Sequence, residues 1–296
     1  MGNTLYLECY SGISGDMTVA ALLDLGADEK KLRKALDSMP LSGYHIEITE
    51  VKKHEIRAKD FHVRLDTDNH DHDMAYLYGH NTAEHREHGH DHDETHHHDH
   101  SHGGHDHAHA HRGMKEIREI FSRSSLTDGA KKRALDIFTV LAEAEAKVHG
   151  TTPDEVHFHE VGAVDSVIDI ASIGICLDDL GITDVITPVL YEGEGTVRCQ
   201  HGILPIPVPA VAEIISAHGI VLHRMPLEGE FVTPTGAATV AAMTTAKTLP
   251  DAYEILRVGV GAGKREYEGP GILRAMLVKE IEISEKNVGR NTQKGE

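Results

Sequence analysis

Residues 4–26 read TLYLECYSGISGDMTVAALLDLG, and this run decides the fold class. Residues 4–9 alternate apolar and polar side chains, which is the two-residue period of a half-buried strand. Residues 17–25 carry apolar side chains at helical spacing, and Gly26 is placed to end that helix. A strand that passes through a glycine loop directly into a helix is typical of α/β proteins.

The rest of the chain continues this alternation. Helices are predicted at 29–37, 114–121, 127–149, 164–180, 210–217 and 237–246. Strands are predicted at 45–51, 61–65, 185–190, 230–233, 253–260 and 271–278, with an extended stretch at 201–209. Thr233 followed by Pro234 fits an N-cap with proline at the first helical position. The mixed spacing predicts an α/β (or α+β) fold, a mixed sheet with flanking helices.

The charge balance excludes some partners. The 296 residues include 48 acidic and 29 Lys or Arg side chains, which gives a formal net charge of −19. Nucleic acids and anionic membrane surfaces attract basic faces, so neither is expected as a partner, whereas metal cations suit this charge. No apolar run is long enough to span a membrane, and Cys9, Cys176 and Cys199 form no metal or redox motif. We expect a cytoplasmic protein.

A histidine-rich tract interrupts the folded pattern. Sixteen of the 25 histidines lie between residues 70 and 111, among Asp, Glu and Gly. Such a composition cannot bury enough apolar surface to fold, so we predict a disordered insertion at 66–112 between segments 1–65 and 113–280, with a polar tail at 281–296. Clustered imidazoles bind borderline metals such as Cu, Ni and Zn, although the tract does not by itself say which metal, and a solubilising linker or an accident of low complexity is the alternative. The tract histidines expected to capture metal ions are His90, His92, His96, His97, His98, His100, His102, His105, His107 and His109.

A second candidate metal site lies in residues 148–197, which contain ten acidic side chains and no Lys or Arg. In an extended segment, His157 and His159 point to the same side, and Glu160 follows them. Asp165 and Asp169 are four residues apart, so they share one face of the predicted helix. Their mutual repulsion calls for a cation, either a metal ion or a basic side chain from elsewhere. A buried helix whose acidic end emerges into water is the plain alternative.

Two further loops have the character of anion sites. Ser11, Gly12, Ser14, Gly15 and Asp16 lie between the first strand and its helix, where unpaired N–H groups face an anion. Thr233 and Thr235 begin a later helix in the same way. Ordinary capping explains the first loop equally well, and it explains the second loop better than an anion site does. His201 is a further metal-ligand candidate, but a lone histidine is more often structural. The glycines of 259–263 precede no helical pattern, so they indicate a glycine-rich strand end and not a nucleotide loop.

Five motifs occur together in one order: residues 11–17, the histidine tract, 157–165, 201–205 and 233–236. Over about residues 4–279 the chain resembles the nickel-insertion proteins of nickel-pincer cofactor biosynthesis, the LarC family. The resemblance implies insertion of Ni²⁺ into pyridinium-3,5-bisthiocarboxylic acid mononucleotide, with two nickel–sulfur bonds and one nickel–carbon bond. It also implies dependence on CTP with Mn²⁺ or Mg²⁺. Family members commonly continue into a C-terminal nucleotide-binding domain, so a separate C-terminal part is expected as a partner.

The resulting hypothesis gives each group a role. His157, His159, Glu160, Asp165, Asp169 and His201 are the candidate metal ligands. Asp16, Asp165 and Glu160 are the candidate catalytic acids and bases, because a nickel–carbon bond requires loss of a ring proton. The two anion loops would hold the phosphate. A non-catalytic nickel store and a metal-dependent phosphohydrolase are the alternative functions, and homo-oligomer formation is left open.

Overall fold

The computed structural model describes residues 2–66, 112–156, 158, 163–199, 201–266 and 268–282. Residues 67–111 of the predicted insertion, and the tail from residue 283, therefore lie outside the described residues. The three cysteines are free thiols, and Cys9 and Cys176 are buried.

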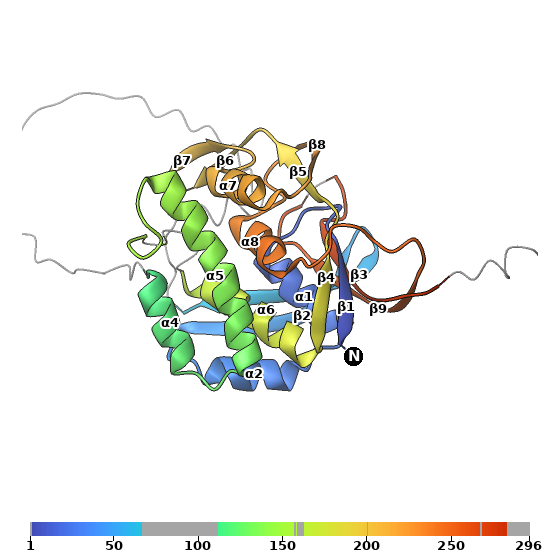
Figure 1. Cartoon of the computed structure of the whole chain (residues 1–296), viewed down its shortest axis with the longest axis horizontal. Helices are drawn as coiled ribbons and strands as arrows, with labels where there is room; N and C mark the ends of the chain where they lie inside the picture. Colours follow the sequence, from blue (N-terminus) through green and yellow to red (C-terminus); the bar gives the residue numbers. More distant parts are fainter. Residues whose placement is uncertain are drawn as a thin grey trace, which may run out of the picture.

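A six-stranded mixed sheet forms the central layer, in the order β2-β3-β9-β10-β1-β4 (Figure 1). Strand β1 is antiparallel to β10 and parallel to β4, so the predicted mixed sheet is confirmed. The six strands are β1 (Asn3–Glu8), β2 (Tyr44–Lys53), β3 (Ile56–Leu65), β4 (Ile182–Ile186), β9 (Tyr253–Ala262) and β10 (Ile272–Glu280).

Helices pack against this sheet and against one another. The described helices are α1 (Gly15–Leu25), α2 (Glu29–Asp37), α4 (Met114–Ser122), α5 (Asp128–His149), α6 (Val164–Asp179), α7 (Pro209–His218) and α8 (Pro234–Met243). Helix α1 contacts β9, β3 and β10, and α6 lies between α1 and α5. Because the chain has no Trp, its largest fully buried side chains are Phe61, Phe121, Phe138 and Phe158.

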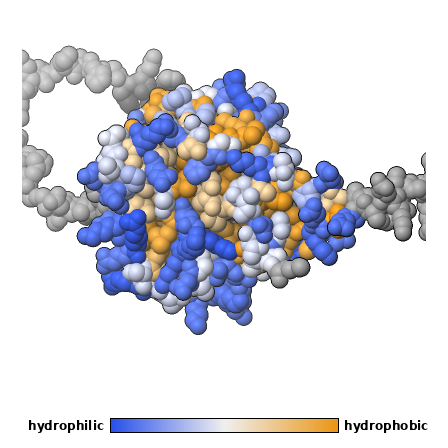
Figure 2. Space-filling model, viewed as in Figure 1, coloured by the Kyte–Doolittle hydropathy of each residue, from blue (hydrophilic) through white to orange (hydrophobic). Residues whose placement is uncertain are grey.

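Two small sheets lie beyond the central layer. Strands β5 (Leu190–Glu194) and β8 (Leu222–Glu228) pair in parallel, and β6 (Thr196–Cys199) pairs with β7 (Gly202–Pro205) in an antiparallel hairpin. Figure 2 shows hydrophilic side chains over α2 and α4, and apolar side chains emerging near β5. Within the described ranges, no helix is long and apolar enough to cross a membrane.

Two glycines of β9 determine how closely α1 approaches the sheet. A Cβ atom on Gly261 would lie 2.1 Å from the backbone oxygen of Met17, and one on Gly259 would lie 2.2 Å from that of Ala21. Any side chain at these positions would push the helix away, so α1 packs closely on β9 only because residues 259 and 261 are glycines. The prediction of a glycine-rich strand is confirmed, since β9 includes both glycines.

The element predictions were partly wrong. Helix α2 has the predicted bounds, but the strand predicted at 185–190 is the end of β4 and the start of β5, separated at 187–189 around Pro188. The stretch 230–233 makes only an isolated bridge, between Val232 and Ile13. Helix α8 begins at Pro234 and ends at Met243, because Thr245 and Ala246 turn to donate to the backbone oxygen of Val185. Strands β6 and β8 were not predicted.

Candidate functional site

The starts of helices α1, α6 and α8 meet at one place. Ser14 caps α1, where its Oγ accepts from the N–H of Met17 at 3.5 Å and its hydroxyl donates to Asp16. A Cβ atom on Gly15 would lie 2.7 Å from Asp169 Oδ2 and 3.0 Å from the methyl group of Thr235. Asp169 of α6 and Thr235 of α8 therefore both press against the first residue of α1.

The two loops predicted to bind an anion lie side by side. Ile13 donates to the backbone oxygen of Phe231 at 2.9 Å, and Thr233 donates to that of Ile13 at 3.1 Å. Gly12 has φ +81°, and a Cβ atom there would lie 2.1 Å from the oxygen of Phe231, so only glycine fits. Thr233 caps α8 by accepting from Gly236 at 3.2 Å. Ser14 and Thr233 thus cap their helices, as the capping interpretation of these loops predicts, and the two loops form one surface.

Three carboxyl groups gather at these helix starts. Burial raises the pKa of Asp16, Asp165 and Asp169. Repulsion by Asp16 and then Asp165 raises the pKa of Asp169 further. Asp16 and Asp165 belong to the first turns of α1 and α6, where the helix dipole stabilises an acid. One oxygen of Asp165 is nevertheless buried and has no hydrogen-bond partner among the described residues. The group is therefore poised to take up a proton or a cation.

The basic side chain that faces this cluster is Lys264, which follows β9. Lys264 lowers the pKa of Asp16 and of Asp169, and it forms an ion pair with Asp60 of β3. His62, also on β3, lies nearby: burial lowers its pKa, and Lys264 lowers it further. Lys264 is a basic side chain from a remote part of the chain, which is one of the two kinds of cation that the repulsion between Asp165 and Asp169 calls for. Its charge only partly offsets burial and repulsion, since the pKa of Asp169 stays well above its usual value.

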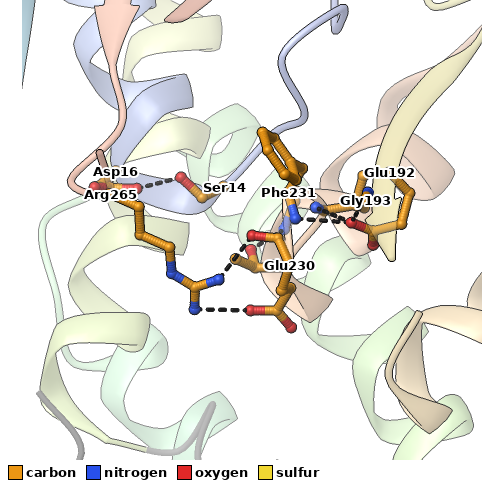
Figure 3. A network of polar contacts seen from close by, with 10 residues as sticks. Ser14, Asp16, Glu192, Gly193, Glu230, Phe231 and Arg265 are labelled. Atoms are coloured by element: carbon orange, nitrogen blue, oxygen red, sulfur yellow. Dashed lines mark hydrogen bonds and ion pairs between the residues drawn. The ribbon is translucent and has the colours of Figure 1, made fainter. Parts of the chain in front are cut away.

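Glu192 of β5 is a buried carboxyl group that sequence reasoning did not single out. Its side chain is 1% exposed, and its Oε1 accepts backbone hydrogen bonds from Gly193, Phe231 and Val232 at 2.9, 2.7 and 3.2 Å (Figure 3). Burial raises its pKa, although these donors oppose the shift. Oε2 has no partner among the described residues. Glu192 therefore fixes the backbone that leads into α8.

Arg265 ties the same loop to the end of β9. Its Nη1 donates to the backbone oxygen of Glu230 at 2.7 Å, and its Nη2 to the Glu230 carboxylate at 3.2 Å (Figure 3). Lys264 and Arg265 are consecutive residues. Lys264 contributes a positive charge beside the aspartate cluster, and the hydrogen bonds of Arg265 hold the 229–233 loop in place.

The predicted metal ligands are only partly described. His157, His159 and Glu160 lie outside the described residues, as do the tract histidines. His201 lies against His149, with ring centroids 5.0 Å apart and ring planes tilted by 38°. Within the described ranges, no three His, Cys, Asp or Glu side chains form a group that could hold a metal ion. The full ligand set stays a prediction.

A mixed α/β fold in which the helix starts bring three carboxyl groups together beside Lys264 defines a protein with an acidic polar cluster. The chain belongs to the nickel insertion protein family, whose model matches residues 5–294.

Named relatives are similar over nearly the whole chain. The pyridinium-3,5-bisthiocarboxylic acid mononucleotide nickel insertion proteins of Alkaliphilus metalliredigens and Akkermansia muciniphila are 49% and 41% identical over 281 and 280 residues. The protein of that name from Staphylococcus saprophyticus is 34% identical over 288 residues. These alignments cover 95%, 93% and 97% of this chain but 61%, 60% and 63% of the relatives, so the chain spans about three fifths of their length. No solved structure matches the chain.

Proposed function

We propose that this chain carries the nickel-handling part of an insertase that acts on pyridinium-3,5-bisthiocarboxylic acid mononucleotide, the compound in its relatives' names. The observation that carries the proposal is the meeting of Asp16, Asp165 and Asp169 at the starts of α1 and α6. Carboxyl groups with so little positive charge around them favour a cation, but among the described residues they form no complete metal-binding group. The proposed ligand set is therefore complete only with His157, His159 and Glu160.

In this proposal nickel is cargo. The tract histidines gather Ni²⁺, and His157, His159 and Glu160 receive it together with Asp165 or Asp169. Mixed imidazole and carboxylate ligands bind nickel but let it leave. The phosphate of the substrate is held at the paired loops by N–H groups and hydroxyls of Ser11, Gly15 and Thr235. Gly12, Ser14 and Thr233 shape these loops, because their own donors bond to Cys9, Asp16 and Ile13. The donors of Ser11, Gly15 and Thr235 bind an anion without adding positive charge that would repel nickel.

The nickel–carbon bond requires that a ring proton leaves. A carboxyl group whose pKa is raised is a stronger base once it is ionised, and Asp16 and Asp165 both lie in this cluster with raised pKa values. We infer that one of these groups, or Glu160, accepts the ring proton.

The sequence contains no Walker loop, the glycine-rich loop that holds the phosphates of many nucleoside triphosphates. We therefore derive no step through CTP and propose that the requirement for CTP with Mn²⁺ or Mg²⁺ belongs to the further two fifths of the relatives' length.

The test is an insertion assay read by mass spectrometry. The chain is mixed with NiCl₂, CTP, MnCl₂ and the substrate, with and without the portion of the Alkaliphilus metalliredigens protein that it does not cover, and that full-length protein is the positive control. We expect metallated product, and its loss in His159→Ala and Asp165→Ala. Asp136→Ala, on the exposed side of α5, is the matched control. Undiminished product from both site variants would refute the site.

Deleting residues 66–112 separates insertion from storage. An insertase keeps its product at saturating nickel, whereas a nickel store loses its function with the tract. Phosphate release from simple esters without nickel would instead favour a phosphohydrolase.

A further inference from the structure

Lys264 is a basic residue that the proposed chemistry has not used. It follows β9, in the turn that leads to β10, and its side chain is 21% exposed. The packing of α1 on Gly259 and Gly261 brings this turn to the start of α1, where a Cβ atom on Gly263 would lie 3.0 Å from Met17 Sδ. Lys264 follows Gly263 in the sequence and Asp16 precedes Met17. The contact between Gly263 and Met17 therefore brings Lys264 and Asp16 near each other.

The surroundings of Lys264 are strongly acidic. Its ammonium group pairs with Asp60, whose side chain is 19% exposed, and it also acts electrostatically on Asp16 and Asp169. An anionic substrate approaching this cluster meets carboxyl groups that repel it wherever they are ionised. Arg265, the next residue, is already engaged with Glu230. Lys264 is thus the cation placed to offset that repulsion.

We propose, resting on the function proposed above, that Lys264 is the anion-binding residue of this site. In the resting protein its partner is Asp60, and an anionic group of a pyridinium mononucleotide replaces Asp60 when the ligand binds. The ligand class is a phosphorylated pyridinium with acidic ring substituents. Lys264 holds such a group beside the aspartates without placing a permanent excess of positive charge there, because Asp60 neutralises it while the site is empty.

The structural alternative makes a different prediction. If the pair with Asp60 only holds β3 to β9, removing either partner weakens the protein in the same way. If Lys264 binds the ligand, substitutions of Lys264 and of Asp60 change the affinity for the ligand in opposite directions. Lys264→Met removes the attraction, whereas Asp60→Asn frees the lysine from its competitor. Lys264→Arg keeps the charge and is the conservative variant.

Calorimetric titration of the whole chain measures binding without nickel insertion, so its failure is separate from failure of the proposed function. Nicotinic acid mononucleotide is the main probe. We expect Lys264→Met to weaken its binding about 10- to 100-fold, as loss of a charge-assisted contact does. Lys264→Arg should restore most of the affinity, and Asp60→Asn should bind at least as tightly as the unaltered chain. Lys31→Met is the matched control, because Lys31 also pairs with an aspartate, Asp179, but lies on α2.

Two further probes identify the anionic group. Nicotinamide mononucleotide keeps the phosphate and lacks the ring carboxylate, and nicotinic acid riboside has the reverse. A defect of Lys264→Met that persists with only one of them assigns Lys264 to the group which that probe retains. Equal affinity of Lys264→Met and the unaltered chain for all three probes would overturn the proposal. So would a loss in Asp60→Asn as large as that in Lys264→Met, with unfolding curves showing that both variants are folded.

Discussion

Asp169 Oδ2 lies 2.7 Å from the point that a Cβ atom on Gly15 would occupy, so the second turn of α6 reaches the start of α1 only because residue 15 has no side chain. This contact sets the position of the aspartate cluster. It also explains why a glycine, the poorest helix former after proline, begins α1.

Gly15→Ala is therefore expected to displace Asp169 and Thr235 while the protein still folds. Small displacements of reacting groups cost about 10- to 100-fold in rate, and we expect insertion to fall by that amount. The added methyl group should lower the free energy of unfolding by about 1–3 kcal/mol. The insertion assay and urea unfolding measure the two effects. Gly269→Ala is the matched control, since a Cβ atom there meets nothing within 4 Å. Full insertion activity in Gly15→Ala would contradict the placement of Asp169 in the site.

Asp169→Asn is expected to stabilise the protein at pH 7 and to abolish insertion. Burial, with repulsion by Asp16 and Asp165, raises the pKa of Asp169 in the folded state well above the unfolded value of about 4. As pH rises from the unfolded pKa of Asp169 toward its folded pKa, the unfolded chain loses the proton first, so the free energy of unfolding of the unaltered protein falls. The amide has no proton to lose. Its advantage should therefore be small near pH 4 and should grow toward pH 7.

Urea unfolding at several pH values from 4 to 8 checks this trend. Asp136→Asn removes a carboxylate from an exposed i, i+4 pair with Lys132 and is the control, for which a change within about 0.5 kcal/mol is expected. If the free energy of unfolding of Asp169→Asn differs from that of the unaltered chain by the same amount at every pH from 4 to 8, the pKa of Asp169 is not raised in the folded state.

Glu192→Ala is expected to destabilise the protein by about 3 kcal/mol or more, because it leaves the buried N–H groups of Gly193, Phe231 and Val232 without their shared acceptor. Glu192→Gln keeps one acceptor oxygen and should lose less than half as much. Urea unfolding gives both values. Equal losses in the two variants would mean that the three donors are not what makes Glu192 important.

Gly261→Ala tests whether the close packing of α1 on β9 depends on this glycine. The added Cβ atom would meet the backbone oxygen of Met17, which cannot rotate away, so a loss of about 1–3 kcal/mol is expected in urea unfolding, again against Gly269→Ala. Unchanged stability accompanied by loss of nucleotide binding would instead favour a nucleotide loop at 259–263.

Local signals in the sequence were sufficient for much of the fold. The apolar spacing of 29–37, the Gly26 C-cap and the Thr233 N-cap are determined within a few residues, and each is present in the structure. The strand predicted at 185–190 failed because an apolar run does not reveal that the chain leaves one sheet and joins another near Pro188. The bounds of α8 failed because Thr245 and Ala246 bond to Val185, a partner 60 residues away.

The site shows the same division. Asp16, Asp165 and Asp169 were singled out from helix position and spacing, and the packing of α1 on α6 brings them together. Their role as metal ligands or bases stays a prediction. Lys264 and Glu192 were not singled out, because the ion pair of Lys264 with Asp60 and the hydrogen bonds of Glu192 with Phe231 and Val232 join residues far apart in the chain. A buried glutamate beside a glycine, as in Glu192-Gly193, is the one local hint, and it is too common to identify a site.

Anomalous scattering at the nickel absorption edge, from crystals of the chain grown with NiCl₂, tests the central claim most directly. The account predicts a nickel peak against the carboxylate of Asp165 or Asp169, with an imidazole of His157 or His159 as a further ligand, and its loss in Asp165→Ala. Nickel confined to residues 70–111, with the carboxylates of Asp165 and Asp169 paired to lysine or arginine, would contradict it.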